Sequence, residues 1–261
     1  MIRPSICLEM IYEDEPFADR IDHVAAHGFD TVEFWTWPDK DLDAVAARLD
    51  EHDLSLAAIS GNTEPRRPED LQRPLTDPTK RDAVVGDIEE SLEVAQRLDC
   101  PNLIVTVGPS LAYTDAEMYD SIVTGLQEVA PAAEDAGVTL VIEPLNTAVD
   151  HEGYFLEQSR VAFDIVREVD SPAVKLTFDI YHQQISEGNI ISTVTANVDA
   201  IGHVHVADVP GRHEPGTGEL HYRNILAALE DAGYDDHVGF EYTAAGDDDE
   251  ALTAIQDLVT S

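Results

Sequence analysis

The chain has 261 residues, of which 43% are hydrophobic, and its 53 acidic residues outnumber its 15 basic ones to give a net charge of −38. Because binding to phosphates or anionic lipids depends on clustered Lys and Arg, this charge argues against a nucleic-acid partner or a membrane surface. No apolar run reaches the roughly 18 residues that a membrane-spanning helix needs.

The acidic residues are spread along the chain rather than gathered in one tail. Dispersed acidity on a chain of normal apolar content is typical of halophilic surfaces, on which concentrated salt screens the self-repulsion. The charge therefore indicates adaptation to a salt-rich solvent rather than the nature of the substrate. We expect the binding partner to be a small molecule.

The N-terminal residues Met1–Pro4 lead directly into an apolar stretch, without the charged region, apolar core and cleavage site of a secretory signal. We therefore expect a cytoplasmic protein, and a homo-oligomer is compatible with the sequence. Cys7 and Cys100 match no metal-finger or redox spacing, so we expect both to be buried, reduced thiols.

Short apolar, β-branched stretches alternate with longer amphipathic stretches along the whole chain. In chain order, the predicted strand and helix pairs are Ser5–Met10 and Phe17–His27, Thr31–Trp35 and Leu42–His52, Ser55–Ser60 and Lys80–Leu98, Asn102–Val107 and Ala116–Ala136, Thr139–Pro144 and Phe155–Val169, Lys175–Asp179 and Ile190–Asn197, Gly202–Ala207 and Tyr222–Ala232, and Val238–Tyr242 and Glu250–Val259. Eight such units predict a (β/α)8 TIM barrel that forms one domain over residues 1–261. An open, doubly wound sheet is the alternative, but the first strand–helix turn has no glycine-rich phosphate motif.

The longest irregular stretch is Gly61–Pro78, which follows the third predicted strand. In a barrel this stretch would overhang the carboxyl ends of the strands, where active sites are built. A loop of this length in a compact domain is usually functional or disordered.

Ionisable residues stand at the ends of the last four predicted strands. They are Glu143, Asp179, the pair His203 and His205, and Glu241. Taken singly, such a carboxylate is more often a loop cap, and such a histidine is more often a core residue. In a barrel, however, the four strand ends converge, and three carboxylates beside an imidazole would repel one another unless a cation lay among them. This oxygen-rich set favours Mn²⁺ or Mg²⁺ over Zn²⁺.

Three segments resemble hydroxypyruvate isomerases, which belong to the xylose-isomerase-like barrels together with the ketose 3-epimerases. The segments are Val141–Asn146, Asp179–Gln184 and His203–Gly218. The resemblance implies metal ligands at Glu143, Asp179, His205 and Glu241, and substrate contacts at His182 and Arg212. The alternative for Arg212 is an ion pair with Glu214 or Glu219 that stabilises its own loop.

Three positions depart from that family pattern. Hydroxypyruvate isomerases have Gln where this chain has His205, and the ketose epimerases have His there. The loops at Ser60–Pro65 and His151–Tyr154 also differ from the expected motifs. In the resembling family these loops face the substrate. The resemblance therefore implies the metal chemistry of this chain more directly than it implies the identity of its substrate.

The expected reaction is isomerisation of a small hydroxy-carbonyl acid through an enediolate. Glu143 and Glu241 would exchange protons with neighbouring carbons, and the metal would stabilise the negative charge on the oxygens. His182 would donate to a substrate oxygen, and Arg212 would pair with the substrate carboxylate.

We consider three alternative functions for this sequence. A ketose 3-epimerase would use the same residues, but its substrate lacks the carboxylate. An apurinic-site endonuclease would need a basic surface and more histidine ligands. A non-catalytic, metal-stabilised protein that binds sugar acids would melt in a metal-dependent way without turnover.

Overall fold

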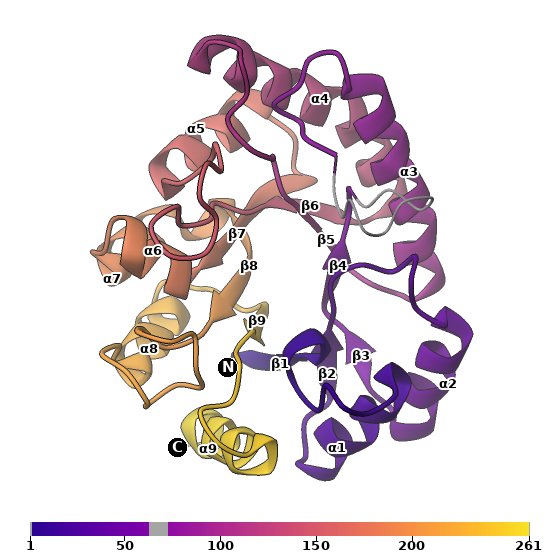
Figure 1. The fold of residues 1–261 in the computed structure, drawn as a ribbon, viewed down its shortest axis with the longest axis vertical. Coiled ribbons are helices and arrows are strands. Elements are labelled where there is room, and N and C mark those ends of the chain that lie inside the picture. The colour runs from indigo at the N-terminus through magenta and orange to yellow at the C-terminus, as the bar shows by residue number, and fades with distance from the viewer. Residues whose placement is uncertain (1, 63–72, 261) are drawn as a thin grey trace.

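The computed structural model describes residues 2–62 and 73–260. Its centre is a ring of parallel strands surrounded by helices (Figure 1). In the described residues the strands are β1 (Arg3–Cys7), β2 (Thr31–Glu33), β3 (Ser55–Leu56), β4 (Ala58–Ser60), β5 (Asn102–Val105), β6 (Thr139–Ile142), β7 (Val174–Asp179), β8 (Ile201–Val206) and β9 (His237–Phe240). They follow the order β3-β2-β1-β9-β8-β7-β6-β5-β4. This arrangement confirms the predicted TIM barrel and excludes the open, doubly wound sheet.

The barrel closes at the third predicted strand, which the structure divides at Ala57. β3 pairs with β2, whereas β4 pairs with β5. Ala57 itself donates its N–H to Val32 O at 2.8 Å, and its carbonyl accepts from the Asn102 side chain at 3.0 Å. The two short strands are therefore one staggered strand that changes partner, as barrel closure requires.

Helices cover the outside of the ring (Figure 1). They are α1 (Arg20–Ala26), α2 (Leu42–His52), α3 (Arg81–Arg97), α4 (Asp115–Ala136), α5 (Ser159–Val169), α6 (Ile180–Ser186), α7 (Ile190–Asn197), α8 (Tyr222–Asp231) and α9 (Asp248–Thr260), with 3-10 turns η1 (Leu8–Met10), η2 (Phe17–Asp19) and η4 (Val198–Ala200). Local signals explain several boundaries: α4, for example, begins with a capping box formed by Thr114 and Glu117. No helix in the described ranges is long and apolar enough to cross a membrane.

Two of the predicted boundaries were wrong because contacts beyond the local sequence decide them. The first strand ends at Cys7, and its expected continuation turns as η1, where Arg20 donates to Leu8 O at 2.8 Å. The helix predicted from Phe155 begins at Ser159, whose N–H is bound by the Gln183 side chain at 3.0 Å. The sequence also failed to predict α6, because seven residues are too few to show a clear helical period.

Two further expectations concern thiols and the long loop. Cys7 and Cys100 are free and buried, as predicted, and burial raises the pKa of the Cys100 thiol to about 12.

Of the stretch Gly61–Pro78, residues 63–72 lie outside the described residues. At the described edges of that stretch, Asn62 Nδ2 donates to Arg73 O at 3.0 Å and to Thr106 O at 2.8 Å.

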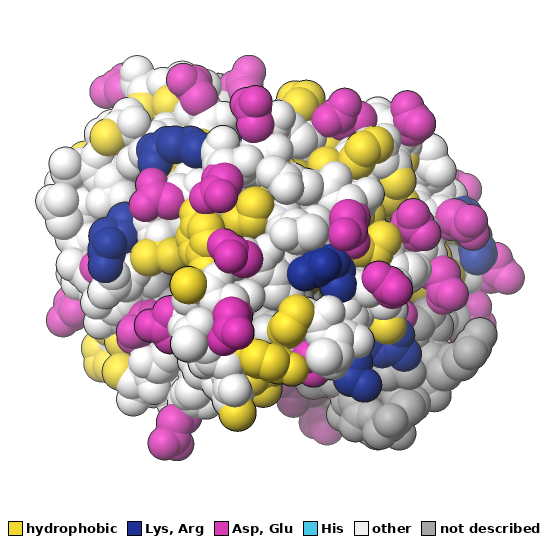
Figure 2. All heavy atoms as spheres, turned by 90° about the horizontal axis from the view of Figure 1, so that it is seen from above, with side chains coloured by type: hydrophobic (Ala, Val, Ile, Leu, Met, Phe, Trp, Pro, Cys, Tyr) yellow, Lys and Arg dark blue, Asp and Glu magenta, His cyan; other side chains and the backbone are white. Residues whose placement is uncertain are grey.

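Acidic side chains dominate the surface. Figure 2 shows Asp and Glu scattered over the whole visible face, with few Lys or Arg between them. We expect the melting temperature to rise from low salt to molar KCl, because salt screens the repulsion within a chain of net charge −38. Each kcal/mol of relieved repulsion should raise the melting temperature by about 2–4 °C. Calorimetry across a KCl series measures this, and a flat or falling melting temperature would contradict halophilic adaptation.

Candidate metal centre

The side chains predicted as metal ligands come together at the carboxyl ends of four adjacent strands. Glu143 directly follows β6, Asp179 ends β7, His205 lies in β8, and Glu241 directly follows β9. Side chains alternate between the two faces of a strand, and the close approach of these four shows that each lies on the face that points toward the barrel axis. One donor atom from each of the four lies within 4.8 Å of the others, and all four residues are buried.

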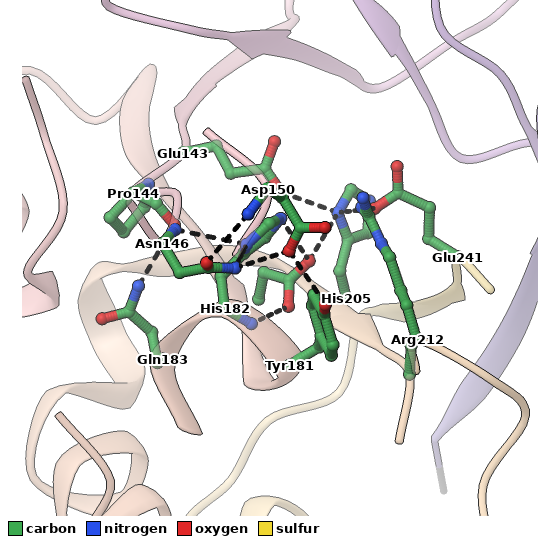
Figure 3. A network of polar contacts seen from close by, with 12 residues as sticks. Glu143, Pro144, Asn146, Asp150, Tyr181, His182, Gln183, His205, Arg212 and Glu241 are labelled. Atoms are coloured by element: carbon green, nitrogen blue, oxygen red, sulfur yellow. Dashed lines mark hydrogen bonds and ion pairs between the residues drawn. The ribbon is translucent and has the colours of Figure 1, made fainter. Parts of the chain in front are cut away.

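His205 lies at the centre of this group. Its Nδ1 atom is 2.9 Å from Glu143 Oε1, 3.3 Å from Glu241 Oε2 and 3.9 Å from Asp179 Oδ2 (Figure 3). Burial disfavours the charged imidazole, but the nearby carboxylates of Glu241 and Glu143 raise the pKa of His205 well above its usual value. Burial also raises the pKa of Asp179. The protein groups therefore attract positive charge to this point.

A divalent cation fits this donor set. Three carboxylate oxygens and one imidazole nitrogen within 4.8 Å of one another can surround a single ion, and their charge matches a dication better than a proton. An oxygen-rich set of this kind is the chemistry that Mn²⁺ and Mg²⁺ prefer.

The two glutamates have different surroundings. Trp35 Nε1 donates to Glu241 Oε1 at 2.7 Å, and Arg212 Nη2 donates to Glu241 Oε2 at 2.8 Å. Burial acts to raise the pKa of Glu241, but Arg212 and His205 more than offset it and lower the pKa below the usual value. Glu143, in contrast, contacts His205 and lies beside the cavity. Glu241 is therefore held as a carboxylate in a fixed orientation.

Arg212 reaches the site from the loop between β8 and α8. Its backbone has a φ of 56°, and its N–H donates to Asp208 O at 3.1 Å, while its carbonyl accepts from Thr243 N at 2.9 Å. The guanidinium lies over the Tyr181 ring, 5.4 Å from its centroid. The ion pair of Arg212 is with Glu241, which corrects the alternative of a pair with Glu214 or Glu219.

His182 enters the site from α6, which begins directly after Asp179. The Asn146 side-chain oxygen accepts from the backbone N–H groups of Val149 at 2.9 Å and Asp150 at 3.3 Å. The Asn146 side-chain nitrogen therefore faces His182 Nδ1, at 2.7 Å, and the Asn146 backbone N–H also donates to Nδ1, at 3.2 Å (Figure 3). Because Nδ1 accepts, the proton of the neutral ring is on Nε2, which is buried and lies 3.7 Å from Asp179 Oδ2.

Burial lowers the pKa of His182 to about 3, so its ring is neutral near pH 7. A neutral ring with a proton on Nε2 can donate a hydrogen bond, and the contact between His182 and a substrate oxygen stays a prediction. The orientation that makes this donation available is set by Asn146, which the sequence analysis did not single out.

A cavity of about 200 Å³ opens beside these groups. Its walls include both glutamates, His205, His182 and Arg212, and also Trp35, Ser60, Ile104, Leu145 and His151. A larger surface hollow of about 460 Å³ lies over α5 and α7, and none of the strand-end groups lines it. Of these two cavities, the smaller one is therefore the one that adjoins the candidate metal centre.

Sequence reasoning missed Glu33 and Trp35 as well as Asn146. Glu33 ends β2 in the structure, but it lies in the middle of the predicted strand Thr31–Trp35. Its carboxylate lies 3.0 Å from His205 Nε2. A charged residue inside an apolar strand is a signal that could have found Glu33, whereas no local signal pointed to Trp35 or Asn146.

Comparison with known proteins identifies relatives over almost the whole chain. Residues 21–258 match the family model described as xylose isomerase-like TIM barrel. The chain is 36% identical to 2-oxo-tetronate isomerase from Cupriavidus necator over 90% of each chain. It is 31% identical to hydroxypyruvate isomerase from Escherichia coli over 93% of each chain. A crystal structure described as AP endonuclease, family 2, from Brucella melitensis superposes with a TM-score of 0.92 at 28% identity, over 98% of this chain and 99% of the other.

Proposed function

The chain belongs to the hydroxypyruvate isomerase family of xylose isomerase-like TIM barrels and is an isomerase, and from this premise we propose that it moves a carbonyl group along a small hydroxy-oxo acid with the help of one Mn²⁺ or Mg²⁺ ion. The observation that carries the proposal is the convergence of Glu143, Asp179, His205 and Glu241 within 4.8 Å beside a cavity. A divalent cation held by these four side chains would act as a Lewis acid toward the carbonyl and hydroxyl oxygens of the substrate.

Glu143 and Glu241 carry out the proton transfers. They approach from β6 and β9, on either side of the strands that carry Asp179 and His205, so a substrate between them would present one carbon to each. Glu241, held ionised by Arg212, is ready to accept a proton, and Glu143 can return one to the neighbouring carbon. The species between the two transfers is an enediolate, with negative charge on its oxygens.

His182 and Arg212 orient the substrate. The Nε2–H group of His182 points into the site and would donate to a substrate oxygen. The Arg212 Nε atom is buried and has no hydrogen-bond partner in the described part of the chain, so the guanidinium has a donor to offer a substrate carboxylate. These donors favour an acid over a neutral sugar.

A small molecule suits this protein better than a nucleic acid. A net charge of −38 repels a phosphate backbone, and the cavity at the site measures only about 200 Å³. The apurinic-site endonuclease alternative therefore receives no support from the charge or the size of the site.

The proposal is tested by assaying 3-hydroxypyruvate, 2-oxotetronates and ketoses with Mn²⁺ in molar KCl, before and after EDTA. We expect turnover of an oxo acid that EDTA abolishes and added Mn²⁺ restores. Turnover that EDTA leaves unchanged would contradict the metal role. Metal-dependent melting without turnover of any compound would instead indicate the non-catalytic binding protein, and turnover of ketoses alone would indicate the 3-epimerase.

The same assay with Arg212→Gln tests recognition of the carboxylate. The unsubstituted enzyme should prefer hydroxypyruvate over its uncharged methyl ester by about 10- to 100-fold in kcat/KM, because a hydrogen bond to a charged group contributes about 1.5–3 kcal/mol. Arg212→Gln should remove this preference, whereas Arg212→Lys should retain part of it. If the unsubstituted enzyme and Arg212→Gln preferred the acid over the ester equally, a group other than Arg212 would bind the substrate carboxylate.

A further inference from the structure

A second polar cluster lies on the other side of His205, inside the barrel. Glu33 at the end of β2 and His203 in β8 are buried, with exposed fractions of 2% and 0%. Glu33 Oε2 is 3.0 Å from His203 Nε2, and Glu33 Oε1 is 3.0 Å from His205 Nε2. One carboxylate thus bridges two imidazoles, and one of these imidazoles also faces the candidate metal centre.

This cluster is costly for the fold. Taking a carboxylate out of water costs several kcal/mol unless its partners compensate, and an apolar side chain at position 33 would avoid that cost. The neighbouring strand also makes room for Glu33, because a Cβ atom on Gly239 would lie 2.2 Å from Glu33 Oε1. A cluster that requires both a buried charge and a missing side chain calls for a functional explanation.

The two ring nitrogens of His205 face different partners. Nδ1 faces Glu143, Asp179 and Glu241, and Nε2 faces Glu33. An ion bound at Nδ1 would leave the proton of the neutral ring on Nε2. Nε2 and Glu33 Oε1 are both buried, lie 3.0 Å apart and have no hydrogen-bond partner in the described part of the chain. Glu33 is therefore the acceptor within reach of the Nε2–H group when His205 binds a cation through Nδ1.

We propose that Glu33 is a positioning residue that holds the ring of His205 in the orientation required of a metal ligand, with His203 fixing the second oxygen of the same carboxylate. The inference rests on the proposed function in one respect, the role of His205 as a ligand. Partners that receive the second N–H of a ligating imidazole commonly raise metal affinity 10- to 100-fold.

The test measures metal binding to the full-length, metal-free protein in molar KCl by Mn²⁺ titration calorimetry. We expect Glu33→Gln to raise the Kd for Mn²⁺ about 10-fold, because the amide oxygen can still accept from Nε2, and Glu33→Ala to raise it about 100-fold. The visible absorption spectrum of the Co²⁺-loaded protein should shift slightly in Glu33→Gln, where the contact to His205 is weaker, and more in Glu33→Ala, where that contact is lost. A purely structural role would move the melting temperature alone.

The matched control is Asp87→Asn in α3. Asp87 is also a buried carboxylate, with an exposed fraction of 5%, and pairs with Arg73 at 3.2 Å. Its lost charge should lower the melting temperature without changing the Kd for Mn²⁺ or the Co²⁺ spectrum. If Glu33→Ala fails to fold, Glu33→Gln carries the test alone, since it keeps the volume of the side chain.

Three outcomes would overturn the proposal. Folded Glu33 variants that bind one Mn²⁺ as tightly as the unsubstituted protein would remove the positioning role and leave the proposed function intact. Two ions in the unsubstituted protein, one of them lost in Glu33→Gln, would make Glu33 a ligand of a second metal. An unsubstituted protein that binds no divalent ion would defeat the proposed function and this inference together.

Discussion

Replacing Glu143 with Gln is expected to lower kcat by about 100- to 10,000-fold, the range typical of general acid–base groups. The amide keeps the shape of the side chain and an oxygen for the metal, but it cannot accept or return a proton. Mn²⁺ occupancy, measured by elemental analysis, should therefore fall much less than kcat. A variant that keeps most of its kcat would show that Glu143 moves no proton.

Glu241→Gln is the companion variant, and its surroundings predict a broader defect. The Glu241 carboxylate binds both Trp35 and Arg212, at 2.7 and 2.8 Å. Its conversion to an amide removes the charge that holds Arg212, so KM for the oxo acid should rise together with the fall in kcat. In Glu143→Gln, by contrast, we expect the change to be confined mainly to kcat.

Isotope exchange distinguishes the two-carboxylate route from its rival. Carboxylates exchange their protons with solvent, so a single turnover in D2O should place deuterium in the product. Complete retention of the substrate hydrogen would indicate a hydride shift between the two carbons. Glu143 and Glu241 would then be ligands only, and the proposed proton transfers would be wrong.

Asp179→Asn is expected to raise the Kd for Mn²⁺ by more than the roughly 100-fold that the loss of a ligand's supporting partner can cause, because Asp179 is itself a proposed ligand. Activity should be lost at ordinary metal concentrations and partly recovered at high Mn²⁺. The melting temperature of the metal-free protein should stay the same or rise, because the substitution removes one of three mutually repelling carboxylates.

Asn is the right replacement because Asp179 has a second role. Its Oδ1 atom accepts from the backbone N–H of His182 at 2.8 Å and caps α6. Asp179→Ala would remove that cap, at a cost of about 0.5–2 kcal/mol, and would displace His182 as well. Unchanged Mn²⁺ affinity in Asp179→Asn would remove Asp179 from the proposed ligand set.

The alternation of strands and helices was predictable because it depends on local periodicity. Short, continuous apolar and β-branched stretches indicate strands that are buried on both faces, apolar residues about every 3.6 positions indicate helices, and neither pattern needs a partner to be recognised. The number of strand–helix units then implied the barrel, and the barrel implied that the strand ends carrying Glu143, Asp179, His205 and Glu241 would meet. Each inference used only the order of residues along the chain.

The partners of these side chains were decided by the tertiary structure. Trp35 reaches Glu241 across 206 positions of sequence, and Glu33 reaches His203 across 170. Such pairs exist only because closure of the ring leaves one strand between β2 and β9, and two strands between β2 and β8, so that inward-pointing side chains from both ends of the sequence meet inside the barrel. Sequence by itself determined which strands carry ionisable ends, whereas barrel closure decided which atom of each group faces the candidate metal centre and which atom faces a supporting residue.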